Sequence, residues 1–219
     1  MRRLSVLLLV PFLNVLAAAR PAAGQAWDAP SFMPSHPVDE LGVFVLDPPF
    51  SEVGLVGLWR QSGNLGLGVR AGILDQEFDG TAFVVGSEFF APLLRAAPGS
   101  PLEALLVLGA GATFADGILA RIPLGVSVGA QLGDADGDVV FTPYVHPRVG
   151  VEILADDDDS VTEVAFMVDF GLDVQVTRSV TLRAAYTWVT GGVDDRFANG
   201  KNALGAGLAI RFGRPVQVR

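Results

Sequence analysis

Residues 164–176, VAFMVDFGLDVQV, alternate strictly between two sets of side chains. A period of two is typical of a β-strand, because successive side chains leave opposite faces of the pleat. In a soluble sandwich the apolar face packs inward, whereas in a membrane barrel it meets lipid and the polar face lines the interior. The apolar set is Val164, Phe166, Val168, Phe170, Leu172, Val174 and Val176, and the other set is Ala165, Met167, Asp169, Gly171, Asp173 and Gln175.

Similar alternating segments, separated by clusters of Gly, Asp, Asn and Pro, follow one another along the chain. Most have ten or more residues, compared with the ~5–6 of typical globular strands and the ~9–11 that cross a bilayer at a tilt. We therefore predict an all-β fold, a closed antiparallel up-and-down transmembrane β-barrel of ten strands, or of eight if two segments do not pair. The predicted strands are 40–46, 52–61, 64–74, 81–90, 103–114, 118–132, 138–153, 162–177, 179–190 and 202–212.

The N-terminus has the features of a secretory signal peptide. Arg2 and Arg3 precede the apolar run LSVLLLVPFLNVLAAA, and the small residues in AAGQA (22–26) allow cleavage after Gly24 or Ala26. The run is shorter than the ~20 residues of a membrane span. We predict a signal peptide at 1–26, an irregular leader at 27–39, the barrel at 40–213 and a C-terminal tail at 214–219.

The predicted connections have an uneven length distribution. The tight turns at 62–64 and 177–179 follow even-numbered strands, whereas the acidic loops at 155–161 and 191–201 follow odd-numbered ones. This is the arrangement of bacterial outer-membrane barrels, which have short turns on one side and long loops on the other. Two connections differ from it: APLLRAAPGSP (91–101) is long where a short turn is expected, and ADG (115–117) is short.

The charges divide unequally between strands and loops. Without residues 1–26 the chain has 12 basic and 24 acidic residues, a balance that disfavours nucleic acid as a partner. On the polar parity of the strands, however, six arginines face six carboxylates. Such a balance suits an enclosed interior, because an unpaired charge away from water is costly. The predicted lumen charge network consists of Arg60, Arg70, Arg121, Arg148, Arg183, Arg211, Glu88, Glu103, Glu152, Glu163, Asp169, Asp173 and His146.

The end of the chain, LGAGLAIRF (204–212), places Gly207, Ile210 and Phe212 at the spacing of the assembly signal of outer-membrane barrels. Residues 40–213 therefore resemble the small outer-membrane β-barrels of the OmpA-like and OmpX-like type. The resemblance implies residence in a bacterial outer membrane and insertion by the outer-membrane assembly machinery. It also implies contact with outer-membrane lipid and lipopolysaccharide.

Two groups of residues are candidates for chemistry. His146 and Asp169 share the lumen parity and form either a proton-transfer unit or a hydrogen-bonded part of the interior. Ser127 is the one serine in the middle of a strand on that parity and is not a convincing nucleophile, so we expect no enzyme and no cofactor. The run at 156–159 is either a loose divalent-ion site or a solvated acidic loop, and we expect no defined metal site at Asp156, Asp157, Asp158 and Asp159.

Prolines within the predicted strands cannot donate to a ladder. We expect Pro143 and Pro147 to weaken one seam of the barrel, by bulges or missing bonds, and Pro123 to lie outside that seam. The function predicted from the sequence is an outer-membrane barrel with a plugged interior, in a structural or surface-interaction role. The alternatives are a narrow pore for small solutes or ions and a soluble secreted β-barrel binding protein.

Overall fold

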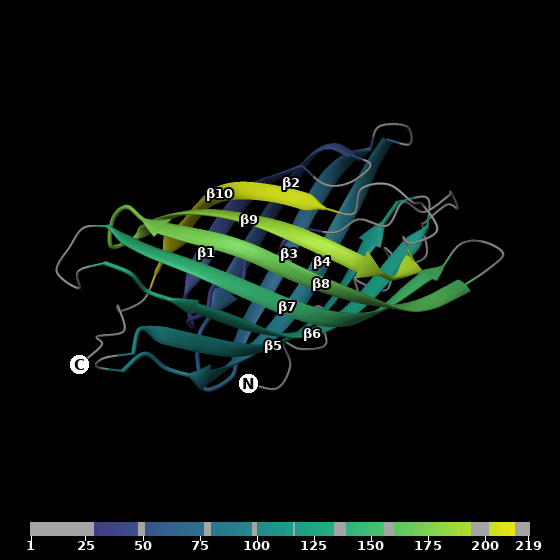
Figure 1. Ribbon diagram of the computed structural model, residues 1–219. Helices are drawn as coiled ribbons and strands as arrows, with labels where there is room; N and C mark the ends of the chain where they lie inside the picture. The colour runs from purple at the N-terminus through teal and green to yellow at the C-terminus, as the bar shows by residue number, and fades with distance from the viewer. Residues whose placement is uncertain are drawn as a thin grey trace, which may run out of the picture.

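The computed structural model describes residues 29–47, 51–76, 80–97, 100–115, 117–133, 139–155, 160–193 and 202–212. Ten antiparallel strands form a closed barrel, in which each strand pairs with its chain neighbours and β1 pairs with β10 (Figure 1). The predicted ten-strand fold is confirmed, and the eight-strand alternative is wrong. The strands are β1 Glu40–Asp47, β2 Ser51–Gln61, β3 Gly66–Gln76, β4 Gly80–Leu94, β5 Leu102–Phe114, β6 Ile118–Ala130, β7 Val140–Ala155, β8 Ser160–Gln175, β9 Val180–Gly191 and β10 Ala203–Arg211.

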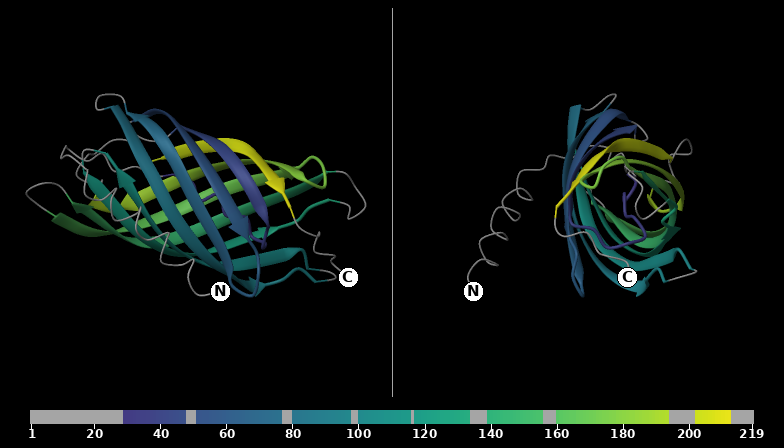
Figure 2. Two further views of the ribbon diagram at one scale, coloured as in Figure 1. Left: turned by 180° about the vertical axis from the view of Figure 1, so that it is seen from behind. Right: turned by 90° about the vertical axis from the view of Figure 1, so that its left-hand side faces the viewer.

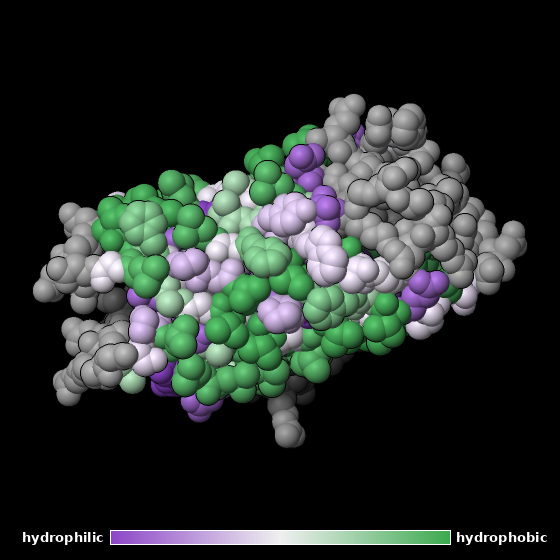
Figure 3. Space-filling view, in the orientation of Figure 1, coloured by the Kyte–Doolittle hydropathy of each residue, from purple (hydrophilic) through white to green (hydrophobic). Residues whose placement is uncertain are grey.

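Side chains alternate between the two surfaces of the barrel along each strand, as the pleat requires. In β8 the side chains of Met167, Asp169 and Asp173 are buried inside, while Phe166 and Phe170 are exposed outside. Every one of the ten strands contributes at least one exposed large hydrophobic residue. Figure 3 shows apolar side chains spread over the strands on the face that it draws. Apolar residues outside and charged residues inside are the reverse of the order in a soluble protein.

The described residues contain no helix that is long and apolar enough to cross a membrane. Residues 1–26, the tail at 214–219 and the acidic run at 156–159 lie outside the described residues.

The connection between β4 and β5 is shorter than the sequence prediction. β4 continues to Leu94, with a register shift between Pro92 and Leu94, and an isolated bridge joins Ala97 to Ser100. The predicted long connection at 91–101 is therefore wrong, because its first residues extend the strand. Beyond residue 90 the strand contains Pro92, and a bulge between Pro92 and Leu94 lets the pairing with β5 continue.

The prolines interrupt strand pairing at two seams. The β5–β6 pairing omits Pro123, and the β6–β7 pairing omits Pro147 together with its neighbour His146. Both ladders resume in the same register, so the prolines cause gaps rather than bulges. Pro143 lies in a second gap of the β6–β7 seam, between the pair Gly129–Tyr144 and the isolated bridge Leu132–Phe141 in the same register, and it faces Leu172 across the uninterrupted β7–β8 ladder. The predicted missing bonds at Pro143 and Pro147 in one seam are therefore confirmed, and Pro123 interrupts a different seam.

Residues 29–39 run through the barrel interior before β1 begins. They have no regular secondary structure, as predicted, but most of their side chains are buried, including those of Ser31, Phe32, Met33 and Ser35. In the end view of Figure 2, this purple segment lies inside the ring of strands. We call residues 29–39 the plug segment. The sequence prediction of a leader did not include its position in the lumen.

Candidate functional site

Two apolar side chains anchor the plug segment. The ring of Phe32 stacks on that of Phe44 of β1, with centroids 4.1 Å apart and an interplanar angle of 19°. Gly205 of β10 makes room for the Phe32 ring, since a Cβ atom at that position would lie 2.5 Å from its Cζ. Met33 packs in a separate cluster with Phe90, Leu105 and Val107. The plug segment thus replaces part of the interior with its own side chains.

Phe32 also has a backbone φ of 52°, in the left-handed region that residues other than glycine rarely adopt. Such a conformation persists where surrounding contacts hold it. Here the stacked ring holds the side chain and two arginines bind the carbonyl oxygen.

The backbone carbonyl oxygens of the plug segment accept hydrogen bonds from the barrel wall. Arg60 donates to Ser31 O at 2.7 Å and to Phe32 O at 2.6 Å. Arg183 also donates to Phe32 O, at 2.9 Å, and the Ser127 hydroxyl donates to Met33 O at 2.8 Å. Three consecutive carbonyl groups that would otherwise be buried without partners are thereby satisfied.

The two arginines belong to a chain of alternating charges that crosses the lumen. Glu40, at the start of β1, lies between Arg60 at 2.8 Å and Arg183 at 2.7 Å. Arg60 and Arg183 are completely buried, and so is Glu40. Each buried charge has partners of opposite sign on both sides, which offsets its desolvation. The chain runs Asp173–Arg183–Glu40–Arg60–Glu88–Arg70, with each contact between 2.6 and 2.8 Å.

A second polar cluster holds Ser31 of the plug segment. Its hydroxyl donates to Asp169 Oδ2 at 2.6 Å, and its Oγ lies 2.8 Å from His146 Nδ1. Because the single hydroxyl proton is directed at the carboxylate, His146 Nδ1 must carry a proton and donate it to Ser31 Oγ. Asp169 also accepts hydrogen bonds from Arg148 at 2.6 Å and from Thr187 at 2.7 Å. The cluster ties β7, β8 and β9 to the plug segment.

This arrangement differs from that of a catalytic Ser-His-Asp triad. In a triad, serine and aspartate bind opposite nitrogens of the imidazole. Here Ser31 Oγ lies 2.8 Å and Asp169 Oδ2 3.4 Å from the same nitrogen, His146 Nδ1. The geometry is that of a latch between the wall and the plug segment.

The remaining members of the predicted charge network also lie on the inward parity, nearer the two ends of the barrel. Arg121 contacts Glu152 at 2.6 Å, and Glu152 accepts a hydrogen bond from the Val193 amide. Glu163 is half-buried beside this pair, as its register partner on β7 is Glu152. At the other end, Glu103 accepts a hydrogen bond from Gln131, while Arg211 donates to Gln175 at 2.6 Å and lies 3.9 Å from Asp173.

Sequence reasoning missed two functional residues of this network, Glu40 and Ser31. Glu40 shares its parity with Gly42, Phe44 and Leu46, so the inward face of β1 does not have a polar pattern. Ser31 lies in a segment without periodicity, and its partner Asp169 is 138 positions away. Neither residue therefore has a local sequence signal that places it in the lumen.

The residues of the predicted assembly signal lie at the end of β10. Ile210 and Phe212 point outward and are exposed, whereas Gly207 faces the interior against Phe44. The Phe212 amide donates to Asp39 O at 2.9 Å, which extends the β1–β10 seam by one bond. Among the described residues, no group of His, Cys, Asp and Glu side chains could hold a metal ion. The weak metal candidates at 156–159 lie outside them.

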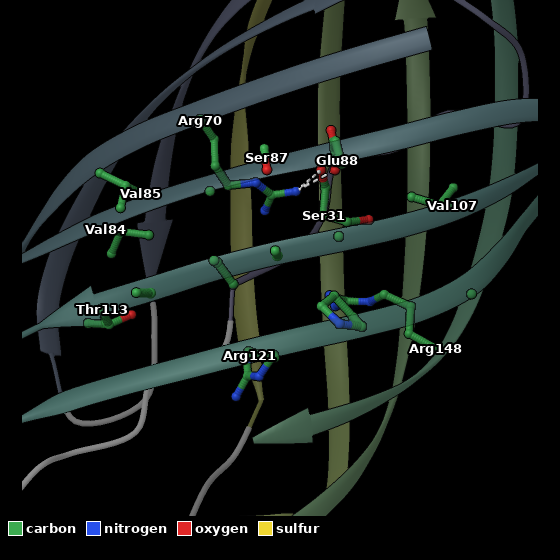
Figure 4. Close-up of a pocket in the computed structure, with 18 of the residues that line it drawn as sticks. Ser31, Arg70, Val84, Val85, Ser87, Glu88, Val107, Thr113, Arg121 and Arg148 are labelled. Carbon is green, nitrogen blue, oxygen red and sulfur yellow. Dashed lines mark hydrogen bonds and ion pairs between the residues drawn. The ribbon is translucent and has the colours of Figure 1, made fainter. Parts of the chain in front are cut away.

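A cavity of about 90 Å³ lies between the plug segment and the wall formed by β3 to β7. Figure 4 shows Arg70, Arg121 and Arg148 around it, together with Glu88 and Ser31. Four glycines of β4, β5 and β6 form part of the wall and leave the space open: Gly86, Gly109, Gly111 and Gly125.

Comparison with known proteins finds no matching family model and no matching curated protein. Solved structures with a distant likeness are outer-membrane and designed transmembrane barrels. A loop-deletion mutant of OmpT, an outer membrane protein of Vibrio cholerae, has 10% identity and a TM-score of 0.36, over 73% of this chain and 53% of that one. In-vitro folded OmpT has 13% identity and a TM-score of 0.31, over 73% and 55%. A de novo designed transmembrane β-barrel has 15% identity and a TM-score of 0.34, over 82% and 100%. The chain thus spans about half the length of OmpT.

Proposed function

We propose that this protein is a bacterial outer-membrane β-barrel closed by its own N-terminal segment, with a structural or surface-interaction role rather than an enzymatic one. The apolar outer surface supports residence in lipid, since burying that surface in water-free surroundings is favourable. Outer-membrane lipid and lipopolysaccharide are then its immediate surroundings, and the outer-membrane assembly machinery inserts it.

The observation that carries the proposal is the fastening of the plug segment. Phe32 O accepts hydrogen bonds from Arg60 and Arg183 together, and both arginines are completely buried. Hydrogen bonds from charged donors are each worth about 1.5–3 kcal/mol. Several such bonds, added to the burial of Phe32 and Met33, favour a plug segment that stays in place on the time scale of ion passage.

A narrow pore is the second candidate, and the cavity beside the plug segment is the observation in its favour. Its polar lining includes three arginines, which would attract anions. A barrel of this size is largely filled by side chains, however, and the plug segment occupies part of the remaining space.

Planar-bilayer recording separates the two candidates. The unmodified barrel is expected to show no steady openings, and a variant lacking residues 29–38 is expected to conduct. A gel that distinguishes folded from heated barrels controls for folding of the variant. Equal, steady conductance of both proteins would contradict closure by the plug segment and favour the pore. A chain that stays monomeric in water without detergent would contradict membrane residence altogether.

A further inference from the structure

The cavity beside the plug segment has an electropositive lining. It is lined by three arginines, Arg70, Arg121 and Arg148, and among the carboxylates of the described residues only Glu88 lines it. The counter-charges of two of these arginines, Glu152 and Asp169, are not lining residues.

Glu88 itself is shared between two arginines. Its Oε1 contacts Arg60 and its Oε2 contacts Arg70, both at 2.7 Å. Arg121 and Arg148 are also paired, with Glu152 and Asp169 at 2.6 Å, but those two carboxylates do not line the cavity. The charged groups at the cavity surface are therefore mainly cationic, which suits an anion.

Two buried nitrogens at the cavity have no hydrogen-bond partner among the described residues: Arg148 Nε and His146 Nε2. Both side chains are more than nine-tenths buried and both line the cavity. A Cβ atom on Gly125 would lie 2.7 Å from Arg148 Cγ and 2.9 Å from His146 Nε2, so the glycine keeps the wall clear at this point. Buried polar atoms left without partners are rare and usually meet a water or an ion.

The two nitrogens have opposite hydrogen-bonding roles. Arg148 Nε–H is a donor. His146 donates through Nδ1 to Ser31, so Nε2 of the neutral ring is an acceptor. A ligand that satisfies both must accept one hydrogen bond and donate another while carrying negative charge.

We propose that the cavity binds one small protonated oxyanion, of which hydrogen phosphate is the model. Its charged oxygens accept from the arginines, and its P–OH group donates to His146 Nε2. The cavity volume of about 90 Å³ is ample for one such ion, since about 10–15 Å³ on this measure already holds a water. The site goes beyond the proposed plugged barrel and does not depend on whether the barrel conducts.

The test is calorimetric titration of the full chain, refolded in detergent at pH 7, with inorganic phosphate and separately with sulfate. Sulfate has the same shape but no proton to donate. We expect saturable phosphate binding about tenfold tighter than sulfate binding, because sulfate leaves one buried acceptor unsatisfied. Absence of saturable binding would show that the cavity holds water only and would overturn the proposal. Equal affinity for the two anions would overturn the assigned role of His146.

Two variants locate the site. Arg121→Gln removes a lining charge, and Thr113→Phe fills the cavity without changing its charge. Each is expected to weaken phosphate binding by about tenfold or more. Arg211→Gln is the matched control, since this arginine lies inside the barrel but does not line the cavity. An equal loss in the control would place the ion elsewhere and overturn the proposal. The comparison of phosphate with sulfate needs no variant, so it stands even if a substitution prevents folding.

Discussion

Replacing Glu40 by glutamine tests the charge chain at its centre. Glu40 accepts hydrogen bonds from Arg60 at 2.8 Å and from Arg183 at 2.7 and 3.1 Å, and all three side chains are completely buried. Glutamine has the same shape but no charge, and its amide nitrogen faces a guanidinium donor. The substitution therefore leaves two buried arginines with one carboxylate partner each, Glu88 and Asp173.

The loss in the free energy of unfolding can be bounded from the burial of Glu40 and its two arginine partners. Removing one member of a buried ion pair typically costs 3–5 kcal/mol, most of it from the charge left behind. Since each arginine keeps a second carboxylate, we expect a loss near the lower bound, about 3 kcal/mol in the free energy of unfolding. The same substitution should weaken plug docking, because Arg60 and Arg183 also bind Phe32 O.

Asp47→Asn on the same strand is the matched control, because Asp47 lies at the exposed end of β1. Its expected effect is within about 0.5 kcal/mol. Urea unfolding in detergent micelles, followed by tryptophan fluorescence, measures both variants against the unmodified chain. A loss below about 1 kcal/mol for Glu40→Gln, or losses of equal size for both variants, would refute the reasoning from the charge chain.

Three further predictions concern the plug segment and the lipid face. Burial, together with the charge of Arg211, lowers the pKa of His36 from 6.5 to about 4. Between these two values the unfolded chain binds a proton at His36 that the folded chain does not, so the stability is fully present above pH 6.5 and should fall as the pH drops toward 4. Urea unfolding measured across this pH range should show a smaller fall for His36→Gln. Gly205→Ala should lower the free energy of unfolding by about 1–3 kcal/mol, because the added methyl group overpacks the Phe32 ring. A variant as stable as the unmodified barrel would contradict the packing of Phe32 against Gly205. Phe170→Arg should cost about 2–4 kcal/mol in a bilayer, and a negligible cost in refolding assays would contradict a lipid-facing position.

The barrel could be predicted from the sequence because its strands carry a local pattern. In β8 the two faces differ strongly in polarity, so the alternation of side chains identifies the segment as a strand. It also places Asp169 and Asp173 on the inward face. The end of β4 shows the limit of that logic: the strand is predicted to end at residue 90 but continues to Leu94, because a bulge that depends on the neighbouring strand extends the pairing.

The plug segment could not be predicted in the same way. Its contacts to the wall are made largely through backbone carbonyl groups, which every residue has, so Ser31 and Phe32 leave no distinctive sequence signal. Glu40 was missed for a related reason. The inward face of β1 is apolar at Phe44 and Leu46 because Phe32 packs against it. Both faces of this strand are therefore apolar, and their alternation does not show which face lies inside the barrel.

The most direct test of the plugged lumen is thiol labelling at position 35. The chain has no cysteine, so Ser35→Cys introduces a single thiol at a fully buried position of the plug segment, and Ser179→Cys places one in the exposed β8–β9 turn. With a charged maleimide, the folded barrel should protect the thiol at 35 until it is unfolded, while the thiol at 179 reacts at once. Equal labelling rates in the folded barrel would contradict an occupied lumen and, with it, the closure of the barrel by its own N-terminal segment.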